Sequence, residues 1–271
     1  MVSAMTEKMR EQLTKMQAAP CLATVRVGEK GDDISYERGA KKRMEKLGIE
    51  CKSYVFDADI SNDDFMREFS RINEDESVNG ILLLRPLPKH LDEKKICEII
   101  NPEKDVDCIS PVNIEKVFVG DETGFLPCTA AAVMECLSFA NVDLQGKNAV
   151  VVGRSLVVGK PLSMLLLNKN ATVTICHSKT QDLAQVCSRA DVLISCIGRA
   201  KMLTDAHVKS GAVVIDVGIN VDDDGKLCGD FDFEKASEKA QIITPVPGGV
   251  GSVTTAVLGL QVIRAAKMQW K

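Results

Sequence analysis

A glycine-bounded turn is the feature of this sequence best suited to bind a ligand. The apolar segment 149–152 ends at Gly153, and a helical pattern begins at Gly159. Glycine lets the backbone approach a pyrophosphate closely, and the first turn of the following helix offers unpaired N–H groups and the positive end of its dipole. The two glycines lie six residues apart, whereas the usual dinucleotide fingerprint spans about five. The pattern therefore predicts a phosphate-binding loop that includes Arg154 and Ser155, with an ordinary turn of an α/β protein as the alternative.

The next strand pattern bears on which dinucleotide this loop binds. Residues 171–176 alternate in the manner of a strand and lead into His177, Ser178 and Lys179. An NAD site has an acidic residue about 20 positions after the glycines, which accepts a hydrogen bond from the ribose 2′-hydroxyl. No acid stands there, and a histidine, a hydroxyl and a lysine, together with Arg154, suit a 2′-phosphate instead. We therefore expect NADP and consider NAD the less suitable cofactor, with solvated surface charges as the alternative for Lys179 and Arg154.

Length and composition exclude several classes of protein. A chain of 271 residues is long enough for two domains with separate cores. The net charge of −4 argues against nucleic acid or a membrane surface as the main partner. The ten cysteines contain no C-x-x-C pair and the three histidines are widely separated, so we expect reduced core thiols and no metal site. No apolar run has the length of a signal peptide core or a membrane span, which predicts a cytoplasmic location.

The periodicity of apolar residues predicts alternating strands and helices. Strands are expected at 20–27, 49–56, 80–84, 149–152, 171–176, 190–198 and 212–218. Helices are expected at 1–16, 35–47, 63–74 and 254–268. This alternation is typical of an α/β fold with largely parallel sheets.

The positions of loops and motifs predict how the chain divides into domains. The stretch 101–127 is rich in loop residues, and the dinucleotide pattern begins only after it. We therefore expect a first domain at 1–120 and a dinucleotide-binding domain at 121–250. The segment 251–271 carries an apolar helix with no sheet of its own to cover, so we expect it to return to the first domain.

Six motifs, in order along the chain, resemble those of the methylenetetrahydrofolate dehydrogenase/cyclohydrolase family. They are KDVD at 104–107, PCT at 127–129, VVGRS with VGKP between 151 and 161, CHS at 176–178, IDVGIN at 215–220 and TPVPGGVG at 244–251. The resemblance implies a substrate domain for folate and a Rossmann-like domain for NADP. It also implies oxidation of 5,10-methylenetetrahydrofolate, usually followed by hydrolysis of the methenyl product, in one-carbon metabolism and purine biosynthesis. Tetrahydrofolate derivatives would be its ligands, and it would be a homodimer formed through the cofactor domain.

The same resemblance assigns roles to individual residues. Tyr36 would lie along the folate ring system and Asp107 would accept hydrogen bonds from the amino-pyrimidine edge, roles that suit an aromatic ring and a carboxylate. A helix-cap contact for Tyr36 and a turn-forming role for Asp107 are the alternatives. The other expected substrate-binding residues are Leu84, Pro247, Gly248 and Gly249. The expected cofactor-binding residues are Gly153, Arg154, Ser155, Gly159, His177, Ser178, Lys179 and Ile219.

Two positions depart from the family pattern. Members that carry out both reactions have a lysine four residues after the tyrosine and a glutamine that orients it, but this chain has Ala40 and Leu84 there. Hydrolysis needs proton transfer to and from water, whereas hydride transfer depends mainly on positioning. We therefore expect a dehydrogenase whose cyclohydrolase step is weak, absent or served by Lys41 or Arg85. The alternatives are the ordinary bifunctional enzyme and a folate- and dinucleotide-binding protein without catalysis.

Overall fold

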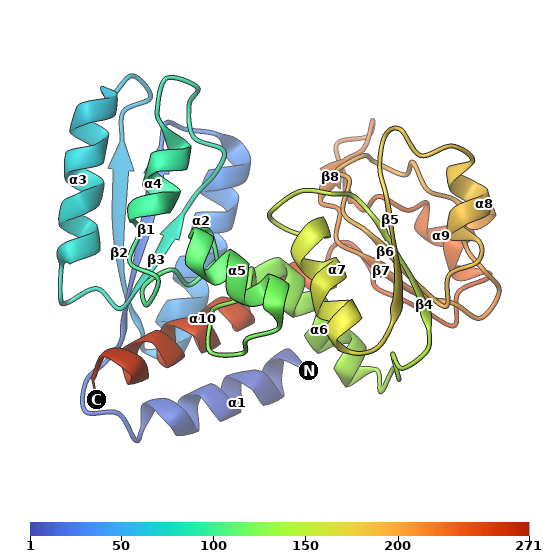
Figure 1. Ribbon diagram of the computed structural model, residues 1–271, viewed down its shortest axis with the longest axis horizontal. Helices are drawn as coiled ribbons and strands as arrows, with labels where there is room; N and C mark the ends of the chain where they lie inside the picture. Colours follow the sequence, from blue (N-terminus) through green and yellow to red (C-terminus); the bar gives the residue numbers. More distant parts are fainter. Residues whose placement is uncertain (271) are drawn as a thin grey trace. The chain divides into compact units, whose positions relative to one another are not determined.

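A computed structural model, which describes residues 1–270, divides the chain into two compact units. The first unit contains Met1–Cys128 and the chain from Thr255 onward, and the second contains Thr129–Thr254. Each unit is built around its own parallel sheet (Figure 1). The predicted α/β fold with two domains is therefore confirmed.

The first unit is a three-stranded parallel sheet with helices around it. Its strands are β1 (Cys21–Val27), β2 (Glu50–Phe56) and β3 (Gly80–Leu83), and β1 lies in the centre. Its helices are α1 (Val2–Leu13), α2 (Gly31–Leu47), α3 (Asn62–Glu74), α4 (Glu93–Ile99) and α5 (Pro111–Val119). Strand β1 is a continuous apolar run because a central parallel strand is covered on both faces. Phe65 and Phe69 of α3 are fully buried in this core.

Helix α5 lies in a stretch that the sequence predicted to be a loop. The sequence did carry its start signal, since the Ser110 hydroxyl accepts a hydrogen bond from the backbone N–H of Asn113 and Pro111 occupies the first helical turn. Gly120 ends the helix in the left-handed conformation. The prediction of a loop was therefore wrong for residues 111–119.

The last helix, α10 (Val250–Gln269), enters the first unit from Thr255 onward. A Cβ atom on Gly259 would lie 2.9 Å from Leu47 Cδ1 and 3.1 Å from Met9 Sδ, so the helix backbone packs closely against α1 and α2. The expectation that this helix returns to the first domain is confirmed.

The second unit is a five-stranded parallel sheet in the order β10-β7-β6-β4-β5. These strands are β4 (Asn148–Val152), β5 (Thr172–Cys176), β6 (Val192–Ser195), β7 (Val213–Asp216) and β10 (Ile242–Ile243). The helices are α6 (Cys128–Phe139), α7 (Gly159–Asn168), α8 (Leu183–Cys187) and α9 (Phe233–Ser237), with a 3₁₀ turn at Asp205–His207. A small antiparallel hairpin, β8 (Asn220–Val221) and β9 (Leu227–Cys228), follows β7. The order reverses between β4 and β6, as in Rossmann-like folds.

The ends of the strands in the second unit line up along one edge of the sheet. In the parallel register, Cys176 pairs with Val152, Val152 with Ser195, and Ser195 with Asp216. The loops that follow these four strands therefore leave from neighbouring points, where ligands bind in open α/β sheets.

The cysteines, the acidic and histidine side chains and the helices add three further features. All ten cysteines carry free thiols. Across residues 1–270, no three His, Cys, Asp or Glu side chains are grouped so that they could hold a metal ion. In the same part of the chain, no helix is both long and apolar enough to cross a membrane.

Candidate active site

The first unit brings Tyr36 and Asp107 together. Tyr36 lies in the first half of α2 and Asp107 in the segment after β3, and both are half-buried. Burial raises the pKa of Tyr36 well above its usual value, and the negative charge of Asp107 raises it further, which requires the two groups to be near one another. Burial also raises the pKa of Asp107, while the Cys128 backbone N–H, 2.9 Å from its Oδ1 atom, acts in the opposite direction. A phenol and a carboxylate of this kind can contact a flat heterocycle and accept hydrogen bonds from it.

The two residues before Val106 anchor the Asp107 segment. The Lys104 ammonium donates to the backbone carbonyls of Asn73 and Asp75, at 2.8 and 2.9 Å. The buried Asp105 carboxylate accepts the backbone N–H groups of Ile109 and Ser110, both at 2.8 Å. The first contact fixes the segment to the end of α3 and the second fixes it to the beginning of α5.

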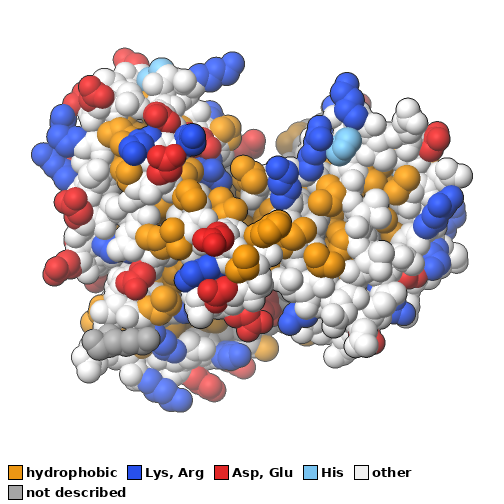
Figure 2. Space-filling model, in the orientation of Figure 1, with side chains coloured by type: hydrophobic (Ala, Val, Ile, Leu, Met, Phe, Trp, Pro, Cys, Tyr) orange, Lys and Arg blue, Asp and Glu red, His pale blue; other side chains and the backbone are white. Residues whose placement is uncertain are grey.

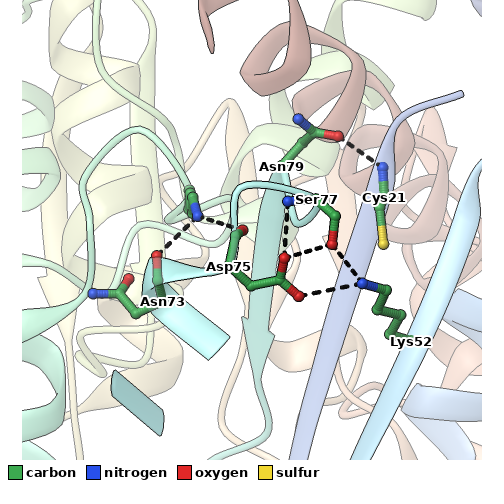
Figure 3. A network of polar contacts seen from close by, with 7 residues as sticks. Cys21, Lys52, Asn73, Asp75, Ser77 and Asn79 are labelled. Atoms are coloured by element: carbon green, nitrogen blue, oxygen red, sulfur yellow. Dashed lines mark hydrogen bonds and ion pairs between the residues drawn. The ribbon is translucent and has the colours of Figure 1, made fainter. Parts of the chain in front are cut away.

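Figure 3 shows the polar network around the first of these anchors. The Asp75 carboxylate accepts hydrogen bonds from the Lys52 ammonium at 3.2 Å and from the Ser77 backbone N–H at 2.9 Å. The Asn79 side chain accepts the Cys21 backbone N–H at 2.9 Å. Asp75, directly after α3, is thereby tied to β2, and Asn79, just before β3, is tied to β1, so the segment that supplies the Asp75 carbonyl to Lys104 is held at both ends.

A glutamine of α10, which the sequence did not single out, holds the other side of the Asp107 segment. The Gln261 amide donates to the carbonyls of Val106 and Leu126, at 2.7 and 2.8 Å, and accepts the Leu126 N–H at 3.0 Å. It therefore connects the residue before Asp107 with the segment that leads to Cys128. Nothing in the local sequence around Gln261 indicates these contacts, because its partners are more than 130 residues away.

The positions of the family lysine and glutamine are apolar and buried. Ala40 is fully buried and the Leu84 side chain is 5% exposed. Lys41, the first candidate substitute, places its ammonium 3.1 Å from Glu37 Oε1. Residues 36 and 41 differ by about 140° around the helix. Lys41 therefore forms an ion pair with Glu37, on a different side of the helix from Tyr36.

Arg85, the second candidate, acts electrostatically on Asp107, the expected substrate contact. Its charge opposes the rise in the pKa of Asp107, and its Nη1 atom donates to Glu93 Oε1 at 3.2 Å. The side chain is 20% exposed. Of the two candidate substitutes, Arg85 is the one whose charge acts on Asp107.

The second unit supplies the glycine turn that the sequence predicted. Gly153 has a φ of +127°, and a Cβ atom there would lie 2.5 Å from Cys196 Sγ. A Cβ atom on Gly159 would overlap the carbonyl oxygen of Gly153. Both positions therefore require glycine, because the turn packs tightly between β4, α7 and the loop after β6. The turn presents the beginning of α7 to a ligand.

The basic and hydroxyl candidates lie on the two loops beside this turn. Arg154 and Ser155 are exposed after β4, and Ser178 and Lys179 are exposed after the neighbouring β5. The ring Nδ1 of His177 accepts the Lys179 backbone N–H at 3.1 Å, which shapes this second loop. Figure 2 shows Lys and Arg side chains on the second unit above α7, where that helix begins in Figure 1.

The remaining candidates also belong to the second unit. Ile219 follows β7 and is 66% exposed. Pro247, Gly248 and Gly249 form the turn before α10, where Gly248 has a φ of +100°. A Cβ atom on Gly249 would overlap the Pro245 carbonyl oxygen, so the turn needs glycine at this position as well.

Comparison with protein families agrees with this division of residues. The chain matches the catalytic domain of tetrahydrofolate dehydrogenase/cyclohydrolase over residues 1–107 and the NAD(P)-binding domain of the same family over residues 127–270. The chain belongs to the tetrahydrofolate dehydrogenase/cyclohydrolase family. The predicted resemblance is confirmed, and the match to the NAD(P)-binding domain contains the whole of the second unit.

Individual members of the family are similar along almost the whole chain. The bifunctional protein FolD of Clostridium kluyveri is 55% identical over 92% of this chain and 87% of its own length. The bifunctional protein FolD of Clostridioides difficile is 56% identical over 95% of this chain and 90% of its own. The crystal structure of the bifunctional enzyme from Campylobacter jejuni superposes with a TM-score of 0.95, at 39% identity, over 98% of this chain and 96% of that one. The Trypanosoma brucei enzyme, solved with NADP and an inhibitor, superposes with a TM-score of 0.94, at 34% identity, over 100% of this chain and 96% of that one.

Proposed function

We propose that this protein oxidises 5,10-methylenetetrahydrofolate to 5,10-methenyltetrahydrofolate, with NADP⁺ as the hydride acceptor. The observation that carries the proposal is that Tyr36 and Asp107 lie within electrostatic range of one another in the part of the chain that matches the catalytic domain of the family. The phenol ring provides an aromatic surface for the pterin, and the carboxylate accepts hydrogen bonds from its amino-pyrimidine edge. Leu84 adds an apolar wall.

The residues of the second unit fit NADP. Gly153 and Gly159 let the backbone approach the pyrophosphate at the beginning of α7. Arg154, Ser155, His177, Ser178 and Lys179 supply the charge and hydrogen-bond donors for a 2′-phosphate. NADP⁺, once bound, accepts the hydride. Ile219, Pro247, Gly248 and Gly249 complete the proposed contacts with cofactor and substrate.

The deciding experiment follows the absorbance of NADPH when purified protein is mixed with 5,10-methylenetetrahydrofolate and NADP⁺. We expect turnover with NADP⁺ and a kcat/KM for NAD⁺ at least about tenfold lower, because NAD⁺ lacks the 2′-phosphate. If both cofactors bind but neither is reduced, the alternative of a non-catalytic binding protein applies instead.

We propose hydrolysis of the methenyl product as a second activity. The relatives from Clostridium kluyveri and Clostridioides difficile are named bifunctional, and this favours the bifunctional alternative over the dehydrogenase alone that Ala40 and Leu84 predicted. Since those two positions supply neither an amine nor an amide, we assign the positive charge of the site to Arg85, beside Asp107. A guanidinium stays protonated, so it orients water instead of exchanging protons with it. Loss of methenyltetrahydrofolate absorbance, with and without Arg85→Met, tests this assignment.

We further propose a homodimer in the cytoplasm, formed through the second unit. Strand β5 is at the edge of its sheet, and Thr174 and Ile175 on it are exposed. An unpaired edge with exposed apolar side chains is a natural place for a second copy to add. Light scattering on the wild type and on Ile175→Lys tests this. We expect the mass of a dimer for the wild type and a shift toward the mass of a monomer for Ile175→Lys. A monomeric wild type would contradict the proposal.

A further inference from the structure

Two carboxylates are buried at the strand ends of the second unit, and the proposed function gives them no role. Asp216 is the last residue of β7 and Asp230 follows β9, with 4% and 0% of their surfaces exposed. Within residues 1–270, neither carboxylate has an ion pair with a basic side chain at 4 Å or less. Burial of a carboxylate without a cation costs stability unless hydrogen bonds compensate for it.

The Asp230 carboxylate compensates for its burial with four donors. Its Oδ2 atom accepts the Ser195 hydroxyl at 2.7 Å and the Ile197 backbone N–H at 2.9 Å. Its Oδ1 atom accepts the Arg199 backbone N–H at 2.9 Å and the Asn220 side-chain amide at 3.0 Å. One side chain therefore connects the loop after β6 with the loop after β7.

The Asp216 carboxylate holds the Asp230 segment in return. It accepts the backbone N–H groups of Asp230 and Phe231, at 3.0 and 2.9 Å, and the N–H of Gly218 at 2.9 Å. A Cβ atom on Gly218 would overlap the Asp230 carboxylate, and a Cβ atom on Gly229 would overlap the Asp216 carboxylate. Each segment thus carries glycine at the point where the acid of the other segment approaches.

The two connected loops lie where half of a dinucleotide binds. A dinucleotide crosses an open α/β sheet at the point where the strand order reverses, which here is between β4 and β6. The candidates for the 2′-phosphate lie after β4 and β5, on one side of this point. The nicotinamide half must therefore lie on the other side, over the loops after β6 and β7 that Asp230 connects. This placement rests on the proposed function.

We propose that Asp230 is a positioning residue for the cofactor, which fixes residues 196–199 and 217–220 in the geometry that receives the nicotinamide half of NADP. Ile219 is exposed on the second of these loops, next to the Asn220 amide that Asp230 holds. Asn at position 230 retains the shape of the side chain but replaces one acceptor oxygen by a donor. Two of the four donors then lose their partner.

The test measures the affinity of Asp230→Asn for NADPH and for adenosine 2′,5′-bisphosphate, the part of the cofactor that lies over β4 and β5. We expect at least a tenfold weaker affinity for NADPH and less than a twofold change for the fragment. The KM for methylenetetrahydrofolate should also change less than twofold. A purely structural role would lower thermal stability and leave the ratio of the two affinities unchanged, which would overturn the proposal.

Asp191→Asn is the matched control. Asp191 accepts the Asn148 backbone N–H at 2.9 Å and the Lys209 ammonium at 2.5 Å, but it precedes β6 and so lies at the opposite edge of the same sheet. Its substitution should change neither affinity by more than twofold, and an equal effect of both variants would overturn the proposal. If Asp230→Asn does not fold, Ser195→Ala and Asn220→Ala each remove one donor, and we expect a two- to fivefold loss for NADPH alone. A wild type that binds neither NADPH nor the fragment would contradict the proposed function, whereas a wild type that binds both, with an Asp230→Asn variant that binds both equally well, would contradict the role of Asp230 alone.

Discussion

At the scale of single residues, the role proposed for Asp107 predicts how substrate affinity should depend on pH. Burial, opposed by the Cys128 N–H and the Arg85 charge, raises its pKa above the usual value of 3.8. In the proposed function, the ionised carboxylate is the form that would accept hydrogen bonds from the pterin. Affinity for the folate substrate should therefore fall as the pH falls through this raised pKa, at a higher pH than an exposed aspartate would show.

We predict that Asp107→Asn raises the KM for methylenetetrahydrofolate by at least about tenfold, because it replaces one charged acceptor by a donor. The KM for NADP⁺ should stay within about twofold, since Asp107 and the cofactor candidates belong to different units. Steady-state kinetics over a range of pH checks both statements. If the KM of Asp107→Asn for methylenetetrahydrofolate still rises at low pH as it does in the wild type, the pH dependence belongs to another group.

Substitutions at Ala40 and Leu84 test how far the proposed hydrolytic reaction depends on a lysine. Both are buried, so a lysine at position 40 alone would lack a polar partner, whereas the pair Ala40→Lys with Leu84→Gln supplies the amine and its acceptor together. We predict that the double variant hydrolyses methenyltetrahydrofolate at least about tenfold faster than the wild type. Ala40→Lys alone should be less stable than the double variant by roughly 1–3 kcal/mol in urea unfolding. A double variant no faster than the wild type would contradict this assignment.

At the scale of elements, Glu37 connects α2 to the sheet of the first unit. Burial alone would raise its pKa, but hydrogen bonds from Ser53, Arg26, Thr24 and Lys41 lower it to about 2 from the usual 4.5. A carboxylate whose folded-state pKa is depressed stabilises the fold above its unfolded-state pKa, and this contribution is lost as the pH falls through the folded-state value. The contribution amounts to about 3 kcal/mol at neutral pH.

We therefore predict that the wild type loses its advantage in stability over Glu37→Gln as the pH falls from about 4.5 to about 2, the window set by the two pKa values. Urea unfolding of both proteins across this range measures the difference. Asp63→Asn is a suitable control because this acid lies exposed in the first turn of α3. A difference between Glu37→Gln and the wild type that stays constant with pH would contradict the assignment.

The elements also show how much the sequence could predict. Strands such as β1 and β4 were predictable because their apolar runs are long and end at glycine. The glycine turn was predicted from its own residues and spacing, whereas Tyr36 and Asp107 were singled out only through the resemblance to the family. Strand order and the Asp230 contacts were not predictable, because Ser195 and Asp230 are 35 residues apart and only the folded sheet brings them together. Helix α5 was missed because its apolar residues, such as Phe118 at 70% exposure, form no buried stripe.

At the scale of the whole molecule, the two ends of the chain build the same unit. Helix α10 contributes Gln261 to the Asp107 segment and packs its Gly259 against α1 and α2. The hydrophobic side chains exposed over α5 in Figure 2 are not part of this packing. The first unit therefore combines residues 1–128 with most of the C-terminal helix α10.

A substitution in α10 tests whether the two units can be perturbed separately. A Cβ atom at Gly259 already approaches Leu47 and Met9 to about 3 Å, so Gly259→Val overpacks this contact and should cost roughly 1–3 kcal/mol. Trp270, the single tryptophan, directly follows α10, and its fluorescence in urea would follow unfolding of the first unit. We predict that Gly259→Val unfolds at a lower urea concentration than the wild type, while its affinity for NADPH stays within about twofold of the wild-type value. Gly31→Ala, where a Cβ atom would meet nothing within 4 Å, should leave the transition unchanged. A parallel loss of NADPH binding in Gly259→Val would mean that the units do not fold independently.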